Sequence, residues 1–147
     1  MGIKLIGAGG FGTRIAGRLA REEGLTGISF AAVDTDRHEL NDSELEETLK
    51  IGPDTPFGGG TEGRVSLGLK AAQNALPEIT RLLTGTDILI IAAGFGGGTG
   101  TGAAPLIARI AHENGIRVCT ILKHPFAFEG AQKSEYSLEG IRSIKDS

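Results

Sequence analysis

The sequence predicts an α/β domain in which a doubly wound, mostly parallel sheet is flanked by helices on both faces. Three observations lead to this prediction. Short apolar runs alternate with amphipathic helical stretches, as in β–α–β units joined by right-handed crossovers. The most apolar run, residues 87–93, has no polar face, as expected of a strand in the middle of such a sheet. The 24 glycines among 147 residues gather at the boundaries between runs instead of spreading evenly as in a linker.

The first half of the chain alternates strand and helix. Residues 3–6 form an apolar run that glycine ends, and residues 13–23 then place apolar side chains at helical spacing. Gly24 ends that helix, and residues 28–33 form a second strand. The acidic stretch over residues 37–47 predicts a short surface helix.

The second half repeats the alternation. Proline punctuates its helices: Pro77 should kink or break the first of them, whereas Pro105 falls in the first turn of the next, where proline is tolerated. The four expected elements are a helix over residues 65–83, the middle strand over 87–93, a helix over 103–114 and a strand over 116–122. An amphipathic helix over residues 129–145 follows them.

Composition excludes several classes of protein. The single cysteine, Cys119, expected on a buried strand, rules out a disulfide framework and a cysteine-based zinc site, and indicates a reducing compartment, the cytoplasm. The formal net charge is −3 and the basic residues are scattered, which argues against a nucleic-acid surface. No apolar run approaches 18 residues, so no membrane span is predicted.

The first glycine cluster carries a dinucleotide pattern. Gly7, Gly9 and Gly12 match G-x-G-x-x-G between a strand and a helix, and Asp34 follows roughly 20 residues later at a strand end. On this motif alone, an NAD-dependent oxidoreductase or sensor and a purely structural turn both remain open.

The second cluster, residues 96–102, alternates threonine with glycine where a helix opens. So many glycines cost backbone entropy, which argues against a merely structural turn. Helix amino termini bind anions, and two such loops at one sheet edge imply a polyphosphate. The chain has no G-x-x-x-x-G-K-[ST] motif, so neutralisation of the phosphates must rely on backbone dipoles and a magnesium ion.

The run Gly96 to Gly102 resembles the signature of the tubulin/FtsZ family. The similarity extends over essentially the whole chain, through residues 7–10, 33–36, the glycine-rich segment up to Gly68, residues 103–105 and residues 125–130. The resemblance implies one nucleotide-binding domain over residues 1–147, without the family's core helix and without its second domain, which carries the catalytic acidic loop.

The resemblance also implies roles for individual residues. Residues 9–12 and 97–102 would approach the phosphates, residues 58–63 would close over the γ-phosphate, and Glu129 would accept hydrogen bonds from the ribose, unless it serves only to cap the last helix. The implied nucleotide-binding residues are Gly9, Gly10, Phe11, Gly12, Thr13, Arg14, Gly60, Thr61, Gly96, Gly97, Gly98, Thr99, Gly100, Thr101, Gly102, Glu129 and Lys133.

Some positions depart from the family pattern. Thr13 and Arg14 replace paired asparagines, Lys133 replaces an arginine, and residues 63–65 replace an alanine–asparagine–proline stretch. Lysine keeps the charge of arginine but loses its planar fork. These departures leave the base selectivity of the site open.

The expected function is therefore binding of GTP or GDP by a cytoskeletal, cell-division type of domain. Magnesium would be held through the phosphates, with no direct protein ligand, and no residue of this chain is expected to be catalytic. Hydrolysis would require acidic residues from a neighbouring subunit in a head-to-tail contact, or from an FtsZ-like partner. The alternatives are the NAD-binding protein and a non-hydrolysing regulator of filaments.

Overall fold

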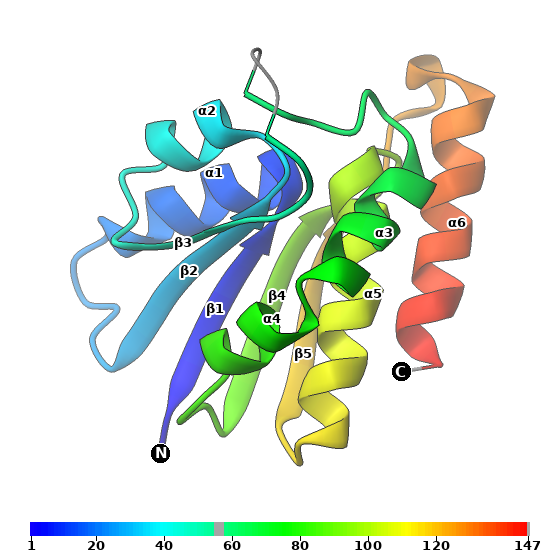
Figure 1. Cartoon of the computed structure of the whole chain (residues 1–147). Helices are drawn as coiled ribbons and strands as arrows, with labels where there is room; N and C mark the ends of the chain where they lie inside the picture. Colours follow the sequence, from blue (N-terminus) through cyan, green and yellow to red (C-terminus); the bar gives the residue numbers. More distant parts are fainter. Residues whose placement is uncertain (55–57, 147) are drawn as a thin grey trace.

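The computed structural model describes residues 1–54 and 58–146 and contains a five-stranded parallel sheet with helices on both faces (Figure 1). The spatial order of the strands is β3-β2-β1-β4-β5. Their bounds are Ile3–Ala8 for β1, Ile28–Asp34 for β2, Glu47–Lys50 for β3, Ile88–Gly94 for β4 and Arg117–Lys123 for β5. The predicted fold class is confirmed.

The sheet differs from the prediction in two respects. Of residues 37–47, expected to form one helix, only residues 37–42 are helical. Strand β3, which was not expected, begins at residue 47, and its residues 47–50 pair with the end of β2. Short, charged edge strands carry little apolar signal, since one side of them faces solvent. The central strand is β1, which pairs with both β2 and β4, so β4 lies beside the middle instead of forming it.

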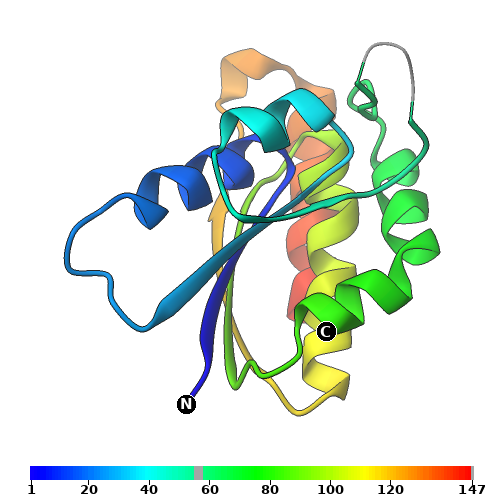
Figure 2. The ribbon, with the colours of Figure 1, turned by 60° about the vertical axis from the view of Figure 1, so that its left-hand side comes forward.

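The helices form two layers, which Figure 2 shows from the side. Helix α1 lies on one face of the sheet with α2 beside it, whereas α3, α4 and α5 cover the other face and α6 packs against α5. Their bounds are Gly9–Ala20 for α1, Arg37–Asp42 for α2, Val65–Asn74 for α3, Leu76–Leu82 for α4, Gly98–Glu113 for α5 and Ala131–Lys145 for α6, preceded by a 3₁₀ turn, η1, over Ala127–Glu129.

Both glycine clusters belong to helices. Helices α1 and α5 begin at Gly9 and Gly98, earlier than the predicted starts at residues 13 and 103, so the glycines form the first helical turns. Pro105 consequently lies inside α5 and not in its first turn. The break predicted at Pro77 is confirmed, because α3 ends before α4 begins with this proline in its first turn.

Glycine allows α1 to lie unusually close to the sheet. A Cβ atom on Gly12 would collide with the carbonyl of Ala92 in β4, and one on Gly7 would collide with the backbone of Gly12. Two facing glycines thus remove the side-chain layer that normally separates helix from strand. The amino terminus of α1 is thereby held directly over the carboxyl ends of β1 and β4.

The main hydrophobic core lies between the sheet and the layer formed by α3, α4 and α5. Its largest fully buried side chains are Ile6, Ile51, Ile79, Leu89, Ile91 and Ile107, while a smaller cluster lies under α1. Cys119 is exposed on β5, contrary to the expectation of burial, because alternate side chains of this edge strand face solvent. Within residues 1–54 and 58–146, no helix has the length and apolar character needed to cross a membrane.

Candidate functional site

A cavity of about 790 Å³ opens at the carboxyl ends of the parallel strands, and we refer to it as the glycine cavity. Helices α1 and α5 both begin in its wall. Neither helix has a side-chain cap among the described residues, and neither has an acidic residue in its first turn. The first-turn N–H groups and the positive ends of both helix dipoles therefore face the same space, which is suited to an anion.

The start of α5 forms one side of this cradle. A Cβ atom on Gly97 would enter open space, so an anion can approach the backbone here. Gly96 has a φ of 99°, which favours glycine, and its N–H donates to the Thr101 hydroxyl at 2.8 Å. The hydroxyls of Thr99 and Thr35 lie 2.8 Å apart and are hydrogen-bonded. These contacts fix the loop without side-chain bulk in front of it.

The start of α1 forms the adjoining side. Gly9 has a φ of 75°, and a Cβ atom on it would lie only 2.8 Å from the backbone nitrogen of Gly100. The two helix starts are therefore in direct backbone contact. They make one continuous cradle, not two separate loops.

The segment from Gly58 to Arg64 closes a third side. The Gly60 N–H donates to the carbonyl of Thr35 at 3.0 Å, and Asp36 forms an isolated β-bridge with Gly59. The buried Thr61 side chain occupies the space that a Cβ atom on Gly98 would need. This segment thus contacts both the end of β2 and the first turn of α5.

Most acidic side chains around the cavity are already engaged. Asp36 caps α2 by accepting from the His38 N–H at 2.9 Å. Glu39 pairs with Arg14 at 2.7 Å, and Glu62 pairs with Arg64 at 2.8 Å. These carboxylates stabilise the walls of the cavity.

Asp34 is the exception. It is 2% exposed, and its Oδ2 atom has no hydrogen-bond partner in the described structure. The pKa of the Asp34 carboxyl is raised to about 6, mainly by burial; two backbone hydrogen bonds oppose the rise, and the nearby charges of Asp36 and Glu39 add to it. An acid therefore lies in the wall of an anion cradle in an environment that disfavours its charged form.

The remaining wall comes from η1 and α6. The Glu129 carboxylate accepts from the Phe126 N–H at 2.7 Å, and its other oxygen lies 3.8 Å from the Lys133 amine. Glu129 therefore caps the turn before α6 while lining the cavity. The amine of Lys123 lies 5.5 Å from the Phe11 ring centre and 5.6 Å from that of Phe126.

The structure brings most of the predicted site residues together. Those that line the cavity are Gly9, Gly10, Phe11, Arg14, Gly60, Thr61, Gly96, Gly97, Gly98, Thr99, Gly100, Glu129 and Lys133. Four others lie behind its wall: Gly12 and Gly102 at helix contacts, Thr101 within the loop, and Thr13 fully buried in α1. Gly100 borders the cavity, but a Cβ atom on it would point at the carbonyl of Gly94 and not into the open space.

The sequence predicted only one residue of α6, Lys133, at the site and missed two others. Gln132 and Tyr136 also line the cavity, and the Gln132 amide donates to the Tyr136 hydroxyl at 2.9 Å. Their spacing of one helical turn was the available signal, since it puts both on the face that begins at Glu129.

A magnesium nucleotide fits the groups present. Glycine leaves room for the phosphates at Gly97, and the uncapped helix starts supply donors. No group of three His, Cys, Asp or Glu side chains able to hold a metal occurs within the part of the chain that the structure describes. The uncapped helix starts suit the oxygens of phosphate groups.

The fold and site together define an α/β domain in which two glycine-rich, uncapped helix starts meet at one cavity. Residues 2–147 match the family described as Tubulin/FtsZ family, GTPase domain. The chain belongs to this family, as its sequence resemblance predicts. Nothing in these comparisons supports the NAD-dependent alternative.

Individual relatives agree with this assignment. The chain is 39% identical over 145 residues to the cell division protein FtsZ of Aquifex aeolicus (strain VF5), covering 99% of this chain and 39% of that protein. An FtsZ dimer from M. jannaschii superimposes with a TM-score of 0.92 at 32% identity, covering 98% of this chain and 42% of that one. CetZ2 from Haloferax volcanii, solved as a GTPgS-bound protofilament, gives 0.81 at 30% identity, covering 99% and 45%. The chain thus spans less than half the length of each of these relatives.

Proposed function

We propose that the glycine cavity binds GTP and GDP, with magnesium held through the phosphates. The observation that carries this proposal is the convergence of two uncapped helix amino termini, α1 and α5, on one cavity that both helix starts line with glycine. Such a wall lets phosphate oxygens reach backbone N–H groups without meeting a Cβ atom. Bound magnesium would offset the phosphate charge.

Each wall of the cavity has a role in this proposal. The first turn of α5, from Gly97 to Gly100, holds the inner phosphates together with Gly9 and Gly10 of α1. Gly60 and Thr61 lie where they can respond to a terminal phosphate. Glu129 orients the ribose, because an ionised carboxylate only accepts hydrogen bonds, whereas ribose hydroxyls donate them.

We further propose that GTP is hydrolysed only where a neighbouring subunit contributes acidic residues. Phosphoryl transfer to water needs a cradle, a cation and a group that orients the water. Asp36, Glu39 and Glu62 are held in caps and ion pairs, and the Asp34 carboxyl is buried at 2% exposure. These engagements support a water-orienting carboxylate from outside the cavity, brought by head-to-tail assembly or by an FtsZ-like partner in the cytoplasm.

Titration with fluorescent GTP, GDP, ATP and NAD, each with and without magnesium, tests the binding proposal. We expect the guanine nucleotides to bind more tightly than NAD and ATP, and GTP binding to strengthen with magnesium. Tighter binding of NAD than of GDP would overturn the proposal in favour of a dinucleotide site. The Gly97→Val variant is the control that should lose binding of the guanine nucleotides.

A further inference from the structure

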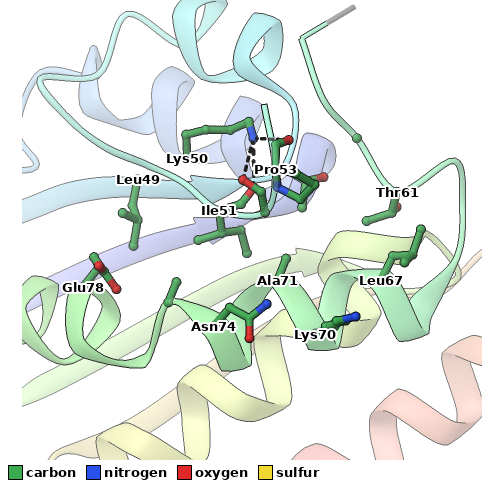
Figure 3. A pocket seen from close by; sticks show the side chains of 14 residues that line it. Leu49, Lys50, Ile51, Pro53, Thr61, Leu67, Lys70, Ala71, Asn74 and Glu78 are labelled. Atoms are coloured by element: carbon green, nitrogen blue, oxygen red, sulfur yellow. Dashed lines mark hydrogen bonds between the residues drawn. The ribbon is translucent and has the colours of Figure 1, made fainter. Parts of the chain in front are cut away.

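A second cavity, of about 550 Å³, lies beside the glycine cavity, between the end of β3 and the helix pair α3–α4 (Figure 3). We call it the lateral pocket. One wall is the segment from Leu49 to Pro53, and the other is the face of α3 and α4 from Leu67 to Glu78. Its volume falls within the range of pockets that bind small organic molecules.

The lateral pocket is mainly apolar inside and charged at its rim. Leu49, Ile51, Leu67 and Ala71 supply aliphatic surface. Lys70 and Asn74 of α3 and Glu78 of α4 also line the pocket, and Figure 3 labels the three side chains. None of these three makes an ion pair or hydrogen bond with a residue that the structure describes.

The wall opposite α3 is held in place by one lysine. The Lys50 amine donates to the carbonyls of Ile51, Gly52 and Pro53 at 3.2, 3.1 and 3.1 Å, which folds the chain after β3 into a fixed turn. A Cβ atom on Gly52 would lie 3.2 Å from that of Ala71, so the two walls approach closely at this point. The pocket is therefore preformed, and the Lys50 amine is occupied by the carbonyls of this wall.

The two cavities share a partition made of Thr35, Gly60 and Thr61, which line both of them. The Thr35 hydroxyl is bonded to that of Thr99 in the glycine cavity, and the Thr35 carbonyl accepts from the Gly60 N–H. A molecule packed against one side of this partition thus restrains groups on the other side. Two sites that bias the same structural element are coupled, and the coupling is reciprocal.

We propose that the lateral pocket binds a small, largely apolar organic anion, and that its occupancy raises nucleotide affinity by fixing the shared partition. The apolar walls take the body of the ligand, and the unpaired Lys70 amine at the rim takes its anionic group. The coupling, but not the pocket itself, rests on the nucleotide-binding function proposed above.

Anilinonaphthalene sulfonate, an aromatic anion whose fluorescence rises in apolar surroundings, is a suitable probe for the full chain. Asn74→Phe fills the mouth of the pocket, whereas Gln73→Phe places the same side chain at the adjacent exposed position of α3, which does not line it. We expect Asn74→Phe to weaken probe binding about tenfold or more and Gln73→Phe to leave it unchanged. Lys70→Gln should weaken it about twofold to fivefold. Equal affinity of the wild type and both phenylalanine variants would overturn the pocket assignment.

The coupling has its own measurement. Saturating GDP should raise the affinity for the probe about fivefold in the wild type. Displacement of the probe by GDP would show that it occupies the nucleotide site and would overturn the proposal, and an unchanged affinity would overturn the coupling. If GDP itself fails to bind, the proposed nucleotide function fails, while the comparison of Asn74→Phe with Gln73→Phe still decides whether the pocket binds the probe.

Discussion

Asp34 shows how a single carboxyl group can make the stability of this domain depend on pH. Its pKa is raised from 3.8 to about 6 by burial, so the folded state holds its proton more tightly than the unfolded state does. The free energy of unfolding is therefore highest below the unfolded pKa and falls as pH rises through the folded pKa, as far as this group is concerned. The full loss amounts to about 3 kcal/mol.

We expect Asp34→Asn to flatten this part of the pH dependence and to raise the free energy of unfolding above pH 7 by roughly 1–3 kcal/mol, because the amide carries no buried charge. Denaturant unfolding at a series of pH values measures this. Asp42→Asn is the matched control, since this carboxylate is exposed on α2 and does not contribute to the raised pKa of Asp34. A variant with the wild-type slope between pH 4 and pH 7 would contradict the argument.

Gly97 offers the direct test of the anion cradle at the residue level. Its Cβ atom would enter open space and its φ of −85° suits any residue, so Gly97→Val should keep the fold and weaken GDP binding about tenfold or more. Gly97→Ala should give a smaller loss. Equal nucleotide affinity in all three proteins, with unchanged melting temperatures, would show that the phosphates do not lie here. Gly100→Val is not equivalent, because its side chain would press against the Gly94 carbonyl and damage the fold.

At the scale of elements, the packing of α5 against α3 depends on glycine. A Cβ atom on Gly102 would lie 2.5 Å from the Leu69 nitrogen and from the Val65 carbonyl oxygen. Neither backbone group can move without displacing α3. Helix α3 also carries one wall of the lateral pocket, so this contact positions both cavities.

Gly102→Ala should therefore destabilise the domain by about 2 kcal/mol or more, because overpacking forces backbone shifts. Gly97→Ala, the same substitution in the same loop, should be close to neutral for stability. Thermal unfolding of the two variants side by side checks the difference. Similar melting temperatures would mean that α3 and α5 can separate more easily than the contact implies.

These contacts also explain which parts of the fold could be predicted from the sequence alone. Apolar runs and helical stripes predicted four of the strands and the flanking helices, because buried periodic segments carry the strongest signal. Strand β3 escaped because Glu47 and Lys50 give it a polar pattern. The starts of α1 and α5 were predicted too late, because glycine disfavours helix. Only the close contacts of Gly9, Gly12 and Gly102 with neighbouring backbone explain why glycine occurs in these helices.

Prediction of the candidate site had a similar limit. Motif spacing found the glycines that line the cavity, but it could not separate those facing the open space from those facing a neighbouring helix or strand. That distinction depends on the direction of each Cα–Cβ bond. The sequence pattern placed Asp34 at a strand end, but the burial of its carboxyl and the lateral pocket arise from elements far apart in the sequence, which no local pattern reports.

At the scale of the whole molecule, the expected behaviour of the isolated chain is nucleotide binding without turnover. Phosphate release from GTP should stay at the background rate across a concentration series of the chain alone, and mixing with the carboxyl-terminal domain of an FtsZ should raise it. Gly97→Val should abolish that increase. A head-to-tail contact of this kind is heterologous, so it propagates into filaments instead of closing a dimer.

Substantial turnover by the chain alone would contradict this expectation. If it were linear in protein concentration and lost on changing Asp34, Asp36 or Glu62, the catalytic acid would lie within the glycine cavity itself. The concentration series separates the two cases, because activity that requires assembly rises more steeply than linearly.

The central position of β1 has a consequence for the order in which the protein folds during its synthesis. Its partner β4 lies far along the chain, and the first strand is joined to it at the base by a bond from the Gly2 N–H to Asp87, 85 residues away. The two halves of the cradle therefore leave the ribosome well apart in time. The start of α1 lacks the backbone of α5 that completes the cradle until β4 and α5 have been synthesised and have packed against it. Nucleotide bound across both helix starts, as proposed above, would therefore act on a chain in which α1 and α5 have already met, and would stabilise the late stages of folding and not the early ones.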